Sequence, residues 1–446
     1  MRPGQECQFS KVEILQICAT IAGIVAVYFL VLFRNNSVGP MSQILHEFLR
    51  PQPTGGTIVT FHKDSDVATQ RQALVRSAGE GVRSLSGGPG RSAEMSDDAP
   101  AFHLEDVGIG VISEHVDAQR SAGILSAEES VVEARPEFWL FAVQDFQDTA
   151  DRTWGIAATG AETSQFTGAG IKLAVLDTGL DFEHPDFTGR NLVQQSFVTG
   201  QLAQDVQGHG THCCGTAAGR EVSQGVPRYG VAPEVHLHVG KVLNDSGSGR
   251  ERDIINGMIW AIQQGCAVIS MSLGRRVRQG EGPSAAYERV GELALDSGSL
   301  IIAAAGNDSA RQFGFIAPVG APANSQSIMA VAALDENLKI ADFSCGEINA
   351  GGGEVDIAGP GVNVLSSVPR PQLYDVKSGT SMACPHVAGI AALLAQSDSN
   401  LRGKALWTAL TDSAKALSAP ASDVGAGLAQ APQGAPDEGY GKTPVA

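Results

Sequence analysis

The chain has 446 residues, of which 43% are hydrophobic and 18% are charged. This length exceeds that of a typical single domain, and the composition excludes a chain that is disordered throughout. The formal net charge of -17 argues against nucleic acid and an anionic membrane surface as partners, because both would repel an acidic protein. The seven cysteines show no short paired spacing, so they form neither the framework of a small secreted domain nor a zinc site.

The chain begins with an apolar run over residues 14–33, which is long enough to cross a bilayer as a helix. A cleaved signal peptide is the alternative, but its apolar core is usually shorter and is followed by small residues, whereas Arg34 follows here. We predict an N-terminal transmembrane anchor or signal over 1–34 and a linker over 35–55. Basic residues flank the run on both sides, so its charges do not fix its orientation. The activity inferred below favours a location outside the cytoplasm, either anchored to the membrane or secreted.

A small α+β domain is predicted over 56–142, followed by a linker over 143–152. Its alternating segments fit a ferredoxin-like β-α-β-β-α-β unit, in which residues 79–99, rich in Gly and Ser, form an insertion. The expected strands are 57–62, 107–113 and 130–134, and the expected helices are 66–77 and 116–122.

From 153 to 432 the pattern changes to apolar strands that alternate with helices, which is typical of an α/β domain with a mostly parallel sheet covered on both faces. We therefore predict a three-layer domain, followed by a flexible tail over 433–446. The expected strands are 171–177, 235–243, 267–273, 300–305 and 327–334, and the expected helices are 250–264, 284–296, 381–396 and 404–417.

Four segments of this domain carry residues suited to nucleophilic catalysis. Asp177 ends an apolar strand, at the sheet edge where ligands of α/β folds bind. A carboxylate there can fix the tautomer of His209, which stands between glycines in Gly-His-Gly and can take a proton from Ser381. Ser381 opens an apolar helix, whose unpaired N–H groups favour an oxyanion, and Asn307 offers a second donor.

These segments follow one another in the order acid, base, amide, serine, and the set resembles the subtilisin-like serine peptidases (subtilases) from about residue 154 to 432. The resemblance implies hydrolysis of protein or peptide substrates through an Asp177, His209 and Ser381 triad and an acyl-enzyme, with Asn307 in the oxyanion hole and no cofactor for the chemistry. A catalytically silent pseudoprotease that binds peptides and a lipid or ester hydrolase are the alternatives.

The resemblance also implies that the small domain is an inhibitory propeptide, which assists folding and then blocks the active site. In that case the chain is made as a zymogen and cuts itself between about residues 137 and 153. An unrelated small α+β binding module is the alternative.

Two segments match those that, in subtilisins, bind an extended peptide by strand addition. The resemblance further implies that Ala303 and Gly306 form one wall of the pocket for the residue before the scissile bond. No acidic cluster stands at these positions, so we expect a small or hydrophobic residue there. The two strand-pairing segments are Gly247, Ser248 and Gly249, and Ser272, Leu273 and Gly274.

The sequence assigns no metal ligands. Many subtilases bind structural calcium through an aspartate equivalent to Asp186 and a polar loop that here carries Gln224 in place of the usual asparagine, so calcium stays open. His212 lies three residues from His209, but no acidic third ligand is apparent, and we expect His212 to be structural. Cys213 follows His209 by four residues, so on a helix its thiol would border the imidazole.

Overall fold

A computed structural model describes residues 53–85, 99–142, 146–147, 153–190, 192–220, 226–349 and 351–434. The predicted anchor or signal, most of both predicted linkers and nearly all of the predicted tail lie outside the described residues. Within the described ranges, none of the helices combines the length and the apolar character that a membrane span requires.

The small domain is built on four antiparallel strands in the order β5-β1-β4-β3, and the two-residue β2 lies parallel to β3. Asp66 caps the first helix, accepting a hydrogen bond from the Thr69 backbone N–H at 2.9 Å. Strand β3 was not predicted, and β5 extends eight residues beyond its predicted end at 134. The elements are β1 (Pro53–Phe61), α3 (Val67–Ala78), β2 (Arg83–Ser84), β3 (Ala101–Leu104), η1 (Glu105–Val107), β4 (Ile109–Ile112), α4 (Ala118–Leu125) and β5 (Val131–Ala142).

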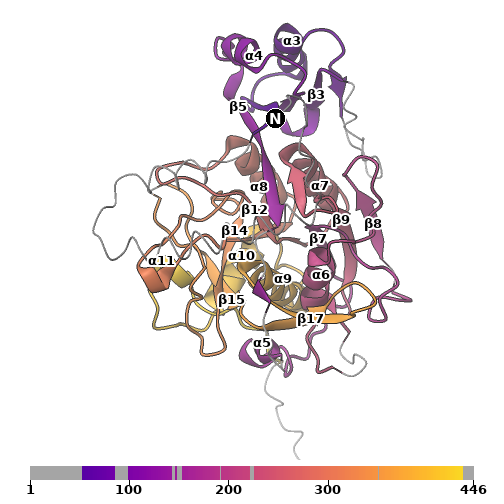
Figure 1. Ribbon diagram of the computed structural model, residues 1–446, viewed down its shortest axis with the longest axis vertical. Helices are drawn as coiled ribbons and strands as arrows, with labels where there is room; N and C mark the ends of the chain where they lie inside the picture. Colours follow the sequence, from indigo (N-terminus) through magenta and orange to yellow (C-terminus); the bar gives the residue numbers. More distant parts are fainter. Residues whose placement is uncertain are drawn as a thin grey trace, which may run out of the picture. The chain divides into compact units, whose positions relative to one another are not determined.

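The second domain contains a sheet of seven parallel strands in the order β15-β14-β13-β11-β7-β9-β8 (Figure 1). The five predicted strands are confirmed. Sequence analysis missed the two edge strands, because β8 is polar and β15 contains Gly and Pro, which weaken the strand signal. The strands are β7 (Lys172–Asp177), β8 (Val193–Ser196), β9 (His236–Lys241), β11 (Val268–Met271), β13 (Leu300–Ala304), β14 (Met329–Leu334) and β15 (Ile357–Pro360).

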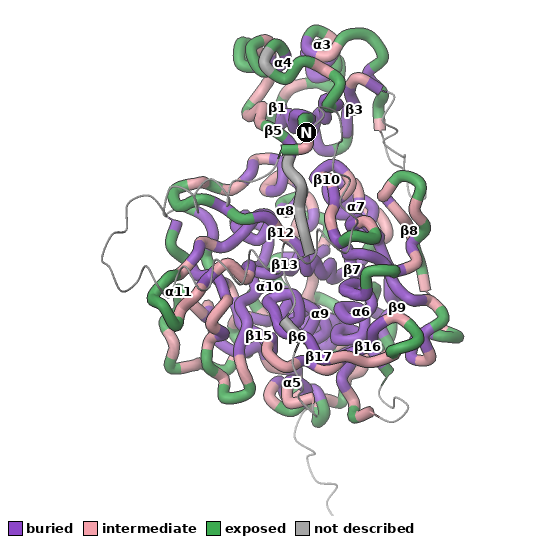
Figure 2. Tube along the Cα trace, viewed as in Figure 1, coloured by how far each residue is buried: buried purple, intermediate pink, exposed green. Residues whose placement is uncertain are grey.

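Helices cover both faces of this sheet, so the predicted three-layer α/β architecture is confirmed. Alternate residues of β7 point to opposite layers: Val175 belongs to the core cluster that includes residues of α6, α9 and α10, and Leu176 belongs to the cluster that includes residues of α7 and α8. The sheet and the inward helix faces are buried in Figure 2. The helices are α6 (His209–Ala218), α7 (Glu251–Gln263), α8 (Ala285–Asp296), α9 (Thr380–Ser397) and α10 (Gly403–Asp412), which ends five residues before its predicted end.

Shorter elements complete the domain. A three-stranded antiparallel sheet has the order β16-β17-β6, and β10 and β12 pair with β5 of the small domain. These elements are α5 (Trp154–Ala158), η2 (Arg311–Phe313), α11 (Ala421–Val424), β6 (Phe146–Gln147), β10 (Ser248–Arg250), β12 (Leu273–Gly274), β16 (Val364–Ser367) and β17 (Tyr374–Ser378).

The small domain contacts the N-termini of helices α7 and α8. Glu137 Oε1 accepts a hydrogen bond from the Arg252 backbone N–H at 3.1 Å, and Glu133 Oε2 accepts one from the Ala285 N–H at 3.2 Å. These carboxylates meet the unpaired N–H groups and the positive end of each helix dipole. Between them, the Arg135 guanidinium forms two hydrogen bonds of 2.6 and 2.7 Å with the buried carboxylate of Glu251.

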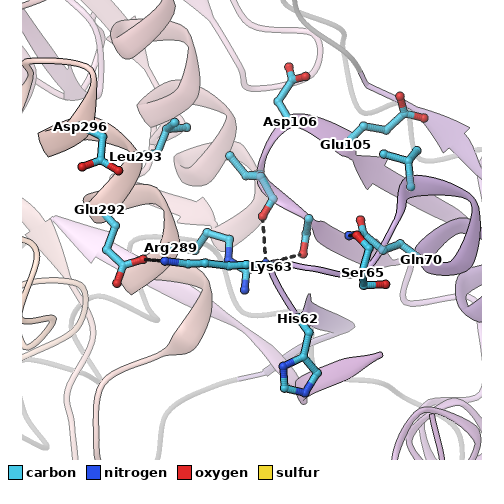
Figure 3. A pocket seen from close by; sticks show the side chains of 13 residues that line it. His62, Lys63, Ser65, Gln70, Glu105, Asp106, Arg289, Glu292, Leu293 and Asp296 are labelled. Atoms are coloured by element: carbon cyan, nitrogen blue, oxygen red, sulfur yellow. Dashed lines mark hydrogen bonds and ion pairs between the residues drawn. The ribbon is translucent and has the colours of Figure 1, made fainter. Parts of the chain in front are cut away.

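A cavity of about 380 Å³ lies at the same junction, between the small domain and α8 (Figure 3). Lys63 Nζ lies 2.5 Å from Glu292 Oε2, and Arg289 Nη1 donates to the carbonyl oxygens of Val107 and Gly108 at 3.2 and 3.3 Å. None of the four candidate catalytic residues lines the cavity. The cavity therefore belongs to the contact between the domains rather than to the candidate active site.

The fold predicts a pH-dependent stability term from His386, which is buried inside α9. Its Nδ1 lies 2.8 Å from the Met382 carbonyl oxygen, and burial lowers its pKa to about 4. The folded chain therefore binds fewer protons than the unfolded chain between about pH 4 and pH 6.5, so stability falls as the pH drops through that window. The full term is about 3 kcal/mol.

This term can be isolated in the inactive Ser381→Ala background by urea unfolding at pH 7 and pH 5. The difference in free energy of unfolding between that chain and its His386→Gln variant should be about 2 kcal/mol smaller at pH 5 than at pH 7. The reason is that the chain with His386 loses most of the stability that depends on a neutral His386. An unchanged difference would show that His386 titrates normally in the folded chain.

Candidate active site

Asp177 and His209 meet at the carboxyl end of β7. Asp177 is the last residue of that strand and His209 is the first residue of α6, and both are buried. His209 Nδ1 lies 2.8 Å from Asp177 Oδ1 and 3.0 Å from Oδ2, so Nδ1 donates to the carboxylate. The Thr178 backbone N–H donates to the same carboxylate at 2.7 Å. This arrangement fixes the ring and leaves Nε2 as the basic nitrogen.

Ser381 lies in the first turn of α9, where Pro385 changes the hydrogen bonding. Proline has no N–H, so the Ser381 carbonyl oxygen has no helical donor four residues later. The Ser272 hydroxyl donates to that oxygen at 2.7 Å, and the Cys213 thiol approaches it at 3.6 Å. In return, the Ser381 hydroxyl donates to the Ser272 carbonyl oxygen at 3.4 Å. Pro385 therefore frees the group that joins the candidate nucleophile to a predicted substrate-binding segment.

Cys213 borders the imidazole, as the four-residue spacing predicts. Its Sγ lies 3.8 Å from His209 Nδ1, one helical turn along α6. The side chain is fully buried, and burial raises the pKa of the thiol, which keeps it protonated. The thiol thus contacts both His209 and the Ser381 backbone.

His212 has a structural role in this arrangement. It is fully buried with Nε2 3.1 Å from the Val364 carbonyl oxygen, and burial holds its pKa well below the ordinary value. Among the described residues, one group of side chains is close enough to hold a metal ion, namely Asp177, His209 and Cys213. His212 is not part of it. In that group, the His209 Nδ1 donates a hydrogen bond to the Asp177 carboxylate, so these two groups are engaged with each other rather than arranged as metal ligands.

Asn307 is held against the start of α9. Its Oδ1 accepts hydrogen bonds from the Thr380 backbone N–H at 2.8 Å and from the Thr380 hydroxyl at 2.9 Å. These bonds fix which end of the amide faces Thr380, so the NH2 end projects away from it. The preceding residue, Gly306, has φ 112°, and a Cβ there would lie 3.0 Å from Cys345 Sγ. The structure thus places Asn307 next to the helix turn that carries Ser381.

The two predicted strand-pairing segments lie on either side of β5. Gly249 pairs with Leu140 and Ser248 with Phe141 on one side, while Gly274 pairs with Phe141 on the other. A Cβ at Gly249 would meet the Val242 carbonyl oxygen at 2.3 Å, which explains glycine at this position. The segments therefore hold an extended chain by antiparallel pairing.

The remaining predicted substrate residues lie close to these segments. Gly247 forms the turn before β10 with φ 81°, and Ser272 precedes β12. Ala303 is fully buried in β13, on the sheet face that packs against α7 and α8. Its methyl group is therefore part of the core, and only Gly306 of the predicted pocket wall adjoins the Asn307 turn.

Hydrogen-bond donors surround Asp186, the aspartate that the resemblance links to calcium. The buried Asp186 carboxylate accepts hydrogen bonds from the hydroxyl of Tyr229 and from that of Tyr374, the latter at 3.1 Å. Arg220 Nε donates to the Asp186 carbonyl oxygen at 3.1 Å. Calcium requires six to eight oxygen ligands, whereas here donor groups face the aspartate. Gln224 lies outside the described residues, so a calcium site that includes it stays a prediction.

Residues 168–440 match the subtilase family of peptidases, and this segment contains all four candidate catalytic residues. The chain belongs to the subtilase family. It is 40% identical to subtilisin DY of Bacillus licheniformis over 240 residues, which are 54% of this chain and 81% of the relative. It is 41% identical to subtilisin E of Bacillus subtilis over 241 residues, 54% of this chain and 59% of that protein. It is 38% identical to an alkaline protease of Alkalihalobacillus alcalophilus over 323 residues, 66% and 79% of the two chains. This subtilase is a serine endopeptidase.

If Asn307 is the oxyanion donor that the resemblance implies, Asn307→Ala should fold normally but reduce kcat by about 100- to 1,000-fold with little change in KM, because that donor is needed only when the oxyanion forms. The measurement is steady-state hydrolysis of a peptide anilide. Asn349→Ala is the control, since this buried asparagine donates to the carbonyl oxygens of Arg278 and Glu281 instead. A loss of less than fivefold for Asn307→Ala would remove it from the oxyanion hole.

Proposed function

We propose that Asp177, His209 and Ser381 form the catalytic triad of this endopeptidase. Ser381 Oγ attacks the carbonyl carbon of the scissile peptide bond while His209 Nε2 takes its proton. His209 then returns the proton to the leaving amine, and water hydrolyses the resulting acyl ester with His209 again acting as base. The buried carboxylate of Asp177 stabilises the imidazolium. The observation that carries the proposal is the 2.8 Å hydrogen bond from His209 Nδ1 to Asp177.

The oxyanion would lie at the start of α9. In its first turn the Thr380 N–H donates to Asn307 and the Met382 N–H donates to the Gly379 carbonyl oxygen, so the Ser381 N–H is the backbone donor for the oxyanion. The helix dipole is positive there. Asn307 adds a side-chain amide, oriented by Thr380. These donors are fixed before the substrate arrives, so they stabilise the tetrahedral intermediate without reorganisation.

Casein hydrolysis separates this proposal from its two rivals. The parent should hydrolyse casein and Ser381→Ala should not, because no other group forms the acyl-enzyme. A parent that is folded but cleaves neither itself nor casein would favour the silent pseudoprotease. Turnover of p-nitrophenyl esters without casein cleavage would favour an ester hydrolase.

We also propose that the small domain, residues 56–142, is an inhibitory propeptide. The supporting observation is that β5 pairs antiparallel with β10 and β12, the strand-addition geometry expected for a peptide substrate. Glu133 and Glu137 reinforce this docking at the N-termini of α8 and α7, and the Arg135–Glu251 pair is buried between them.

The register of β5 indicates which bond is cut. Leu273 pairs with Ala142, and the residue before Leu273 is Ser272, whose carbonyl oxygen accepts from the Ser381 hydroxyl. Ala142 therefore pairs next to the residue that contacts the Ser381 hydroxyl. We propose cleavage after Val143, the next residue in the sequence. Valine also has the hydrophobic character expected for the residue before the scissile bond.

Mass spectrometry of the matured chain should find Gln144 at its N-terminus, whereas Ser381→Ala should accumulate at full length. Val143→Asp should slow maturation, because an aspartate would place a charge in an apolar pocket. The control is Asp145→Asn, which lies after the proposed bond. An N-terminus outside 137–153, or normal maturation of Ser381→Ala, would contradict autoprocessing of this segment.

We further propose that the peptidase works outside the cytoplasm, either anchored by the N-terminal apolar run or released from it. The support is the sequence of residues 14–33 alone. Cleavage after Val143 would remove residues 1–34 from the mature enzyme, so the unprocessed Ser381→Ala chain is the one to test. Its recovery in the membrane fraction with residues 1–34 still attached would identify the anchor, and its release without them would identify a cleaved signal.

A further inference from the structure

Asp205 is a buried acid that the proposed chemistry leaves unused. It lies four residues before His209, and its side chain is 2% exposed. Oδ1 accepts hydrogen bonds from the backbone N–H groups of Gln207 and Gly208 at 3.0 and 2.8 Å. Oδ2 accepts from the Thr211 N–H at 2.8 Å and from the Thr211 hydroxyl at 2.7 Å. One carboxylate thus ties together the turn before α6 and the first turn of that helix.

Thr178 extends this network to the other side of the candidate site. Its hydroxyl donates to Asp205 Oδ1 at 2.9 Å and accepts a hydrogen bond from the Gly210 N–H at 2.8 Å. Thr178 directly follows Asp177, and Gly210 directly follows His209. A Cβ at Gly210 would meet the Gly179 carbonyl oxygen at 2.3 Å, so the two backbones are in close contact here.

The geometry points to Asp205 as a positioning residue for the catalytic pair. Through Thr178 and the N–H groups of the turn, it fixes the separation between the backbone that carries Asp177 and the backbone that carries His209. A misplacement of about 1 Å in such a pair can reduce the rate about 100-fold, so this separation controls kcat. The inference rests on the proposed triad, because Asp205 would act only through Asp177 and His209. Asp205 itself is given no contact with the substrate.

The charged groups around Asp205 determine how the loss of its negative charge affects His209. Asp181 lies on the turn after β7 and pairs with Arg370, and Lys241 of β9 donates to the Thr178 carbonyl oxygen at 2.5 Å and pairs with Asp245 at 2.8 Å. Asp177 is the other anion next to His209. Loss of the Asp205 charge therefore leaves the imidazolium with less negative charge nearby, which makes protonation of His209 less favourable.

A matched pair at Thr178 tests the link without changing any charge. Thr178→Val keeps the shape but removes the hydroxyl, so kcat per active site should fall at least tenfold while KM changes less than about twofold. Thr178→Ser keeps the hydroxyl and should stay within about threefold of the parent. Active sites are counted by titration with a fluorophosphonate, so that unfolded or unmatured chains are not included. Equal kcat values for the serine and valine variants would overturn the inference.

Asp205→Asn tests the carboxylate itself. We expect kcat to fall about 100-fold and the acid limb of the kcat/KM profile to move to lower pH. The control is Asp356→Asn, a half-buried acid, which accepts from the Ala330 N–H at 2.7 Å in the sheet region of β14 and β15. It should lose stability but keep the kcat and pH midpoint of the parent.

The outcomes separate two failures. A parent that does not react with the fluorophosphonate would refute the proposed triad. A reactive parent whose Asp205→Asn variant keeps kcat and the pH midpoint would refute the positioning role alone. If Asp205→Asn does not fold, the comparison of kcat between Thr178→Val and Thr178→Ser tests the positioning role.

Discussion

The hydrogen bond between Asp177 and His209 is the interaction on which the rest of the site depends. A carboxylate buried at the end of a parallel strand is costly unless donors surround it. The sheet supplies one donor from its own backbone, the Thr178 N–H, and α6 supplies the other from its first residue. The helix can begin there because Gly208 adopts φ 98° immediately before it. The same hydrogen bond therefore both compensates for the burial of Asp177 and positions His209.

Ser381, the proposed nucleophile, is joined to the same arrangement through a local irregularity in α9. Pro385 leaves the Ser381 carbonyl oxygen without its helical partner, and Ser272 and Cys213 contact it instead. Ser272 belongs to the segment that pairs with β5, and Cys213 lies beside His209. The Ser381 carbonyl oxygen thus contacts the predicted substrate segment directly and His209 indirectly, through Cys213. A substitution at any of these positions is expected to affect the other two, so their energetic effects should not be additive.

Much of this arrangement could be predicted from sequence, because its parts have strong local signals. Buried parallel strands are continuous apolar runs, and the residues that end or follow them carry the chemistry. The polar edge strand β8 and the Gly- and Pro-containing β15 have weak local signals, and β5 is prolonged by pairing partners more than 100 residues away. Asp205 was missed for a related reason, since its proposed role depends on a hydrogen bond with Thr178, which follows β7 and lies 27 residues earlier in the chain. Around Asp186, the sequence could not show that Tyr229 and Tyr374 would donate to the carboxylate.

The rate of fluorophosphonate labelling, with the adduct located by peptide mapping, tests the central interaction most directly. Asp177→Asn keeps the shape of the site but favours the wrong histidine tautomer, so labelling should slow by about 10⁴-fold with the adduct still on Ser381. Labelling of Asp177→Asn at the parent rate, or an adduct on another residue in the parent, would contradict the account.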